Sequence, residues 1–183
     1  CSKNDMSRYD LVWNELTSDP IYPPGVKHNH TRRNDGYYDG ALMGNGLLGT
    51  NFYKLEDGAY RLNVGRSDVT DIRDNGFSLY RSGRLPIGYF VLRTVGNVQE
   101  EHMRLHIKDA VTTGSIKTDA GTISFKTYVH AVKNAIVFET ETSGKEIEYA
   151  WEFVPYPALS TRFIYFSGDD LERVNEMWKK GFL

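Results

Sequence analysis

The chain of 183 residues contains a single cysteine, Cys1, so no disulfide can form within it and cysteine chemistry cannot stabilise the fold. It has no apolar run near the roughly 20 residues that a helix needs to cross a bilayer. Its 22 basic and 24 acidic residues give a formal charge of −2, without the basic excess typical of nucleic-acid binding. These absences exclude a disulfide-stabilised fold, and we expect neither a helical membrane span nor a nucleic-acid partner.

Alternation of apolar and polar residues predicts an all-β protein. A period of two runs through residues 103–108, 123–130 and 146–153, and turn signals at residues 119–121, 133–134 and 143–145 lie between them. Residues 85–95 are apolar on both faces, which is typical of a strand buried between two layers. We therefore predict an antiparallel β-sandwich over residues 10–157, beginning with a short strand at residues 10–16.

A glycine-rich turn and a hairpin stand together in residues 39–74. Residues 48–55 alternate in polarity, Asp57-Gly58 supplies a turn signal, and Tyr60 resumes the period of two. Gly44-Asn45-Gly46 precedes the first arm, and its glycines permit positive φ angles and close approach of a ligand or another chain. Taken alone, this tripeptide predicts a tight turn or bulge that leads into a strand.

The string Leu42-Met43-Gly44-Asn45-Gly46-Leu47-Leu48-Gly49, with a hairpin that ends Arg61-Leu62-Asn63, resembles the start of the N-terminal β-sandwich of family-95 glycoside hydrolases, the α-L-fucosidase group. The family's Glu-Asp and Trp after that Asn are absent here, so the match is nearer to uncharacterised secreted bacterial relatives. The resemblance implies an exported accessory module acting on carbohydrate, with a catalytic helical barrel as partner. The family's catalytic carboxylates lie in that barrel, so we assign no catalytic residue to this chain. The alternatives are a free-standing carbohydrate-binding surface lipoprotein without catalysis and a purely structural scaffold.

Residues 158–183 are expected to form a separate C-terminal segment with one helix. Ser167 is a capping candidate, acidic residues follow it, and Lys179 and Lys180 lie near the terminal Gly181. Leu171, Val174 and Trp178 would share one side of this helix. The helix is therefore expected either to dock on the sandwich or to begin a linker to the catalytic domain that the resemblance implies.

Cys1 is the candidate lipid-attachment site. A first cysteine followed by Ser2-Lys3-Asn4-Asp5 resembles the start of a mature bacterial lipoprotein, in which that cysteine carries the lipid. A chain cut at this point for expression would begin in the same way. Together with the implied export, the pattern predicts a periplasmic or outer-membrane-anchored protein that reaches a membrane only through Cys1, with residues 1–9 as a tether.

Six residues beside the motif are candidate sugar contacts: Tyr37, Tyr38, Asp39, Asn45, Arg66 and Asp68. Aromatic rings stack on the apolar faces of sugars, and acids and amides bind hydroxyl groups. The same residue types are ordinary in loops, which is the alternative explanation. His102 and His106 are four residues apart in a predicted strand, a separation of about 13 Å, so we expect no metal site there and no cofactor.

Overall fold

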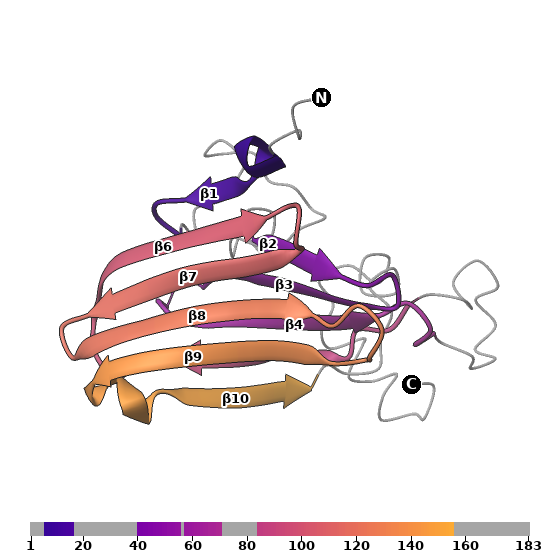
Figure 1. The fold of residues 1–183 in the computed structure, drawn as a ribbon. Helices are drawn as coiled ribbons and strands as arrows, with labels where there is room; N and C mark the ends of the chain where they lie inside the picture. The colour runs from indigo at the N-terminus through magenta and orange to yellow at the C-terminus, as the bar shows by residue number, and fades with distance from the viewer. Residues whose placement is uncertain (1–5, 17–39, 56, 71–83, 156–183) are drawn as a thin grey trace, which may run out of the picture.

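The structure is a computed structural model that describes residues 6–16, 40–55, 57–70 and 84–155. Within these ranges ten strands form two antiparallel sheets of five strands that face each other (Figure 1). Sheet A has the order β1 (Leu11–Trp13), β6 (Val98–His106), β7 (Val111–Thr118), β8 (Gly121–Val129), β9 (Ile136–Gly144). Sheet B has the order β10 (Ala150–Pro155), β5 (Gly88–Arg93), β4 (Tyr60–Arg66), β3 (Leu48–Lys54), β2 (Ala41–Gly44). The predicted all-β sandwich is confirmed.

The core lies between the sheets and is built from aromatic and aliphatic side chains. Phe52 of β3 is fully buried, and its ring centroid lies 5.2 Å from that of Phe125 and 5.6 Å from that of Phe138 in sheet A. On β8, Ile123 and Phe125 point inward while Ser124 and Lys126 face solvent, as the period of two predicts. Each such fully buried side chain contributes roughly 1.5–3 kcal/mol, so burial holds together a fold without disulfides.

The predicted hairpin is confirmed and belongs to a larger unit. Leu48 pairs with Arg66 and Lys54 pairs with Tyr60, and Gly58 has the positive φ of 85° that the turn requires. Residues 41–44, expected only as an approach to the hairpin, form β2, which pairs with β3. Gly44-Asn45-Gly46 is therefore the tight turn between two strands of a three-stranded meander.

The prediction of one strand over residues 146–153 is wrong in its first half. Residues 145–148 form a 3-10 helix, η3 (Lys145–Glu148), and β10 begins only at Ala150. Glu146, expected on the wet face, is fully buried, whereas Ile147 is 73% exposed. The carboxylate of Glu146 accepts the N–H groups of Val95 and Gly96 and the hydroxyl of Thr118. These tertiary contacts outweigh the local alternation, because a buried carboxylate needs such donors.

Other predicted segments are shorter in the structure or lie outside it. The first strand is limited to Leu11–Trp13, after a 3-10 helix, η1 (Met6–Tyr9), within the predicted tether. The strand predicted over residues 85–95 is β5, in which Val91 and Leu92 are buried on opposite faces. Cys1, Tyr37 to Asp39 and the C-terminal helix lie outside the described residues. In the part that the structure describes, no helix is long and apolar enough to span a membrane.

Candidate functional site

Asn45, at the centre of the glycine-rich motif, uses its side chain to hold the β2–β3 turn. Its Oδ1 accepts the N–H groups of Leu47 (3.0 Å) and Leu48 (2.8 Å). Its Nδ2 donates to the carbonyl oxygens of His130 (2.9 Å) and Lys133 (3.4 Å). The side chain thus joins a turn of sheet B to the loop between β8 and β9 of sheet A. This geometry gives Asn45 a structural role, and its contact with sugar stays a prediction.

Arg66 and Asp68 form a bidentate ion pair beside this turn. Arg66 Nε and Nη2 lie 2.9 and 2.7 Å from the two carboxylate oxygens of Asp68. The hydrogen bond from Arg66 lowers the pKa of Asp68, whose side chain is 51% exposed. Ser67, between them, donates its N–H to Leu47 O at 2.9 Å. The structure therefore brings three of the six predicted residues, Asn45, Arg66 and Asp68, to one end of sheet B.

At the same end, three glycines lie side by side on the outer face of sheet B. Gly44 pairs with Gly49, and Gly49 pairs with Gly65. We call Gly44, Gly49 and Gly65 the glycine row. An added Cβ would meet nothing within 4 Å at Gly65, and its nearest neighbour at Gly49 would lie 3.8 Å away. Because no side chain of this row rises from the sheet, a ligand can approach the backbone closely there.

A row of polar and aromatic residues lies next to the glycine row. Asn51 pairs with Asn63, and Asn63 pairs with Tyr89; we call these three residues the polar row. Arg61 donates from Nε to Asn63 Oδ1 at 2.8 Å, and its guanidinium lies 3.6 Å from the centroid of the Tyr89 ring. Along β4, Arg61 is buried, Asn63 is half-buried and Gly65 is exposed. This face therefore opens towards the glycine row.

Sequence reasoning did not select Asn63 or Tyr89 as site residues. The period of two does place Arg61, Asn63 and Gly65 on one face of β4, opposite Tyr60 and Leu62. That alternation was the sequence signal that could have identified Asn63 as a site residue. The partners on β3 and β5 depend on strand register, which the sequence did not define beyond the hairpin.

A second polar contact crosses the interior of the sandwich. Glu101 of β6 accepts from Lys54 Nζ of β3 at 2.5 Å and from the hydroxyl of Tyr60 on β4. The side chain of Glu101 is 6% exposed, and Tyr60 is fully buried. Burial and the hydrogen bond to Glu101 both raise the pKa of Tyr60, so its phenol stays neutral. This cluster is a polar link between the sheets, because the groups face one another inside the core.

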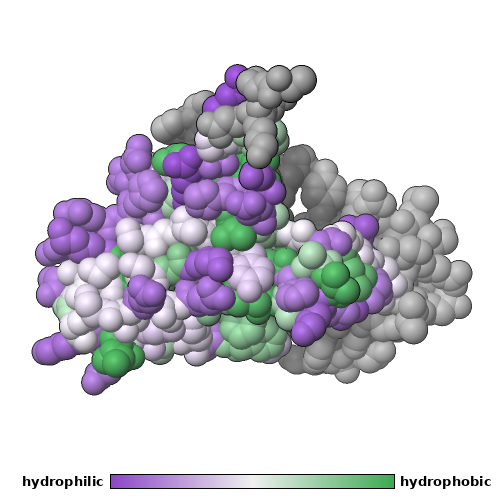
Figure 2. All heavy atoms as spheres, in the orientation of Figure 1, coloured by the Kyte–Doolittle hydropathy of each residue, from purple (hydrophilic) through white to green (hydrophobic). Residues whose placement is uncertain are grey.

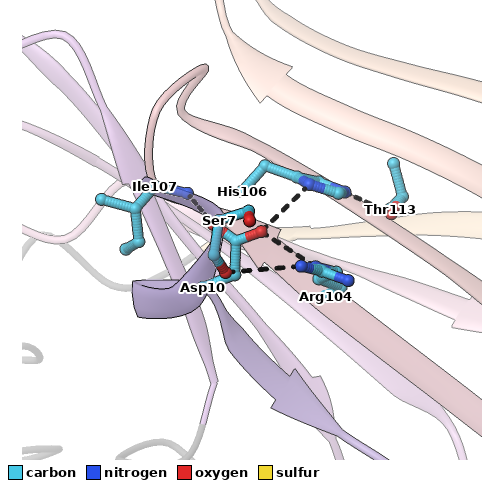
Figure 3. A network of polar contacts seen from close by, with 6 residues as sticks. All are labelled: Ser7, Asp10, Arg104, His106, Ile107 and Thr113. Atoms are coloured by element: carbon cyan, nitrogen blue, oxygen red, sulfur yellow. Dashed lines mark hydrogen bonds and ion pairs between the residues drawn. The ribbon is translucent and has the colours of Figure 1, made fainter. Parts of the chain in front are cut away.

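The third polar cluster holds β1, at the edge of sheet A, against its neighbour β6 (Figure 3). Asp10 accepts the Ile107 N–H at 3.0 Å and Arg104 Nε at 2.9 Å, and His106 Nδ1 lies 3.5 Å away. His106 Nε2 lies 2.9 Å from Thr113 Oγ1. Burial by itself raises the pKa of Asp10, but the hydrogen bonds from Ile107 and Arg104 hold it below its usual value. The Asp10 carboxylate lies closer to Arg104 than to His106. Because Asp10 directly precedes β1 and its partners lie in or just after β6, these contacts fix β1 at the edge of the sheet.

The outer face of sheet A has the character of a solvated surface. Figure 2 shows this face as largely hydrophilic to neutral. Two ion pairs lie on it, Lys117 with Glu100 at 2.8 Å and Lys126 with Glu139 at 3.2 Å. Among the described residues, no three histidine, cysteine or acidic side chains gather in a way that could hold a metal ion. The glycine row and its neighbours are therefore the candidate site.

Comparison with known proteins leaves this site to be judged on its geometry. No protein-family model matches the chain, and no curated protein matches it. Around backbone that lacks side chains lie the half-buried Asn63 amide and Tyr89 ring and the partly exposed Arg66–Asp68 pair, whereas Asn51 and Arg61 are buried. Such groups bind a neutral ligand that carries both hydroxyl groups and apolar faces.

Proposed function

We propose that this chain is an accessory β-sandwich module of an exported, glycoside-hydrolase-like protein and that it binds carbohydrate at the glycine row. The observation that carries the proposal is the register that sets Gly44, Gly49 and Gly65 beside the polar row. A pyranose can lie close to backbone without side chains while amides and charged groups bind its hydroxyl groups. The resemblance of residues 42–49 to the family-95 sandwich supports carbohydrate as the ligand.

The proposed role is binding and support, with cleavage left to a catalytic helical barrel. A glycosidase needs two carboxyl groups about 5–10 Å apart across the bond that breaks. Of the acids described above, Glu101 and Glu146 are buried in internal hydrogen bonds, and Asp68 is paired with Arg66 at 2.7 Å. We accordingly expect the chain alone to show no turnover of aryl fucosides or other aryl glycosides. Robust hydrolysis by the purified chain would overturn the accessory role.

A free-standing surface lipoprotein is the second version of this proposal and shares the same site. In that version the chain binds carbohydrate without a catalytic partner and is anchored by the lipid expected on Cys1. Mass spectrometry of the chain expressed with a bacterial export signal would detect an acyl-modified Cys1. The gene sequence beyond Leu183 separates the two versions, because only the accessory module requires a following catalytic barrel.

Gly65→Leu tests the carbohydrate site directly. The open space around Gly65 and its ordinary strand φ allow a side chain without disturbing the fold. We expect the parent chain to bind on a glycan array that includes fucosylated oligosaccharides, and Gly65→Leu to weaken the binding measured by calorimetry about tenfold or more. Ser115→Leu, on the outer face of sheet A, is the matched control and should bind normally. Absence of glycan binding, or equal binding by the Gly65 variant, would refute the proposed site.

A further inference from the structure

The ring of His130, just after β8, holds the loop that Asn45 contacts. The N–H groups of Val132 and Lys133 donate to His130 Nδ1 at 3.2 and 3.1 Å. The His130 N–H donates to Ala135 O at 2.9 Å, and its carbonyl accepts Asn45 Nδ2 at 2.9 Å. Because two N–H groups point at Nδ1, that nitrogen acts as an acceptor and carries no hydrogen.

Hydrogen bonds lead from this ring to the candidate carbohydrate site. The loop supplies the two carbonyl oxygens that accept Asn45 Nδ2, those of His130 and Lys133. Asn45 Oδ1 in turn fixes the N–H of Leu47, and Leu47 O accepts the N–H of Ser67. Ser67 lies between the paired residues Arg66 and Asp68. Each step joins neighbouring groups, so a change in the loop has a direct route to the site.

We propose that His130 is a positioning residue that sets the conformation of the glycine-row site according to pH. Histidine is the side chain whose ordinary charge change falls between about pH 5 and pH 8. A proton on Nδ1 would point at the Val132 and Lys133 N–H groups, so both hydrogen bonds would be lost. The loop then releases Asn45, and the β2–β3 turn loses its link to sheet A. The effect on sugar binding rests on the proposed function, whereas the conformational coupling does not.

The other titratable or charged groups next to His130 in the described part of the chain include no second histidine. Next to His130 lie Lys126 and Tyr128 of β8, Lys133 of the loop, Glu139 and Glu141 of β9, Arg66 at the end of β4, and Asp68 just after it. Lys126 is paired with Glu139, and the Arg66 guanidinium is paired with Asp68. A response centred near neutral pH at this end of the sandwich is therefore assigned to His130.

Amide NMR spectra recorded from about pH 8 to about pH 5 test the coupling. We expect the Asn45 side-chain amide and the backbone amides of Leu47 and Ser67 to follow the titration curve of the His130 ring. In His130→Asn, the asparagine side chain offers an oxygen that can accept the Val132 and Lys133 N–H groups. An asparagine side chain does not titrate between about pH 5 and about pH 8. In that variant these signals should be independent of pH, whereas His102→Asn on the outer face of sheet A should titrate like the parent. Persistence of the response in His130→Asn, or no response in the parent, would overturn the proposal.

Calorimetry with a glycan identified on the array supplies the second readout. Binding by the parent chain is expected to weaken about tenfold or more between about pH 8 and about pH 5, while His130→Asn binds equally at both values. Coupled NMR titrations without any glycan binding would support the role of His130 and refute the carbohydrate assignment. Glycan binding that is unchanged by pH in the parent would support the carbohydrate assignment and refute the role of His130.

Discussion

The carboxylate of Glu146 accepts the backbone N–H of Gly96 at 2.8 Å, and this contact joins two of the connections between the sheets. Gly96 lies in the β5–β6 connection and Glu146 in the β9–β10 connection. The same carboxylate also accepts the Val95 N–H and the Thr118 hydroxyl. Burial alone raises the pKa of Glu146, but these hydrogen bonds lower it below its usual value. One side chain thus holds an end of the sandwich together.

Glu146→Ala should destabilise the fold by about 3 kcal/mol, because it removes hydrogen bonds to a charged acceptor and leaves two N–H groups without one. Urea unfolding followed by circular dichroism measures this loss. Glu148→Ala, on the exposed side of the same 3-10 helix, is the control and should change stability by less than about 0.5 kcal/mol. Similar urea midpoints for the two variants would show that the hydrogen bonds of Glu146 contribute little to the stability of the fold.

The Lys54–Glu101 pair predicts unequal effects of single and double substitution. Lys54→Met leaves the nearly buried Glu101 carboxylate without its cation and should cost about 3 kcal/mol. Lys54→Met combined with Glu101→Leu should cost less than Lys54→Met alone, since no charge is then left unpaired. A complete double-mutant cycle in urea measures both values. A double variant less stable than Lys54→Met would contradict the proposed origin of the cost.

Asp10 predicts a contribution to stability that acid removes. Its pKa in the fold is lower than the ordinary 3.8, so the contribution is present above that value and is lost as pH falls through the folded pKa. Asp10→Asn should therefore be less stable than the parent near neutral pH, and the difference should shrink below about pH 4. Urea midpoints of both proteins across this range provide the measurement. A difference that stays constant with pH would exclude a stabilising ion pair between Asp10 and Arg104.

The Asn45 turn predicts different results for two substitutions. Asn45→Asp keeps an oxygen for the Leu47 and Leu48 N–H groups but removes the donors to His130 and Lys133. Asn45→Ala removes both the acceptor oxygen and the donors. It should lower the free energy of unfolding by about 2 kcal/mol, more than Asn45→Asp does. Amide hydrogen exchange at Leu47 and Leu48 should rise in the alanine variant above that in the aspartate variant. Equal exchange in the two variants would mean that Oδ1 does not hold the turn.

Local patterns in the sequence predicted the parts of the fold that neighbouring residues decide. Alternation of Ile123 and Phe125 with polar residues gave β8, and Asp57-Gly58 gave the β3–β4 turn. The same rule failed at Glu146. Its two backbone donors, Val95 and Gly96, lie 51 and 50 positions earlier in the chain, and its hydroxyl donor, Thr118, lies 28 positions earlier. A pattern with a period of two reports which face a residue is on, and it carries no information about a distant partner.

For the candidate site, the sequence indicated the location and the tertiary structure decided the roles. The Gly44-Asn45-Gly46 motif and the nearby Arg66 and Asp68 were selected from local chemistry, and the fold places them at one end of sheet B. The pairing of Gly49 with Gly65, the row of Asn63 and Tyr89, and the contact of Asn45 with His130 became visible only with strand register and the approach of sheet A. The physical reason is range: backbone preferences and polarity act within a few residues, whereas a hydrogen bond across 85 positions exists only after burial has brought the two sheets together.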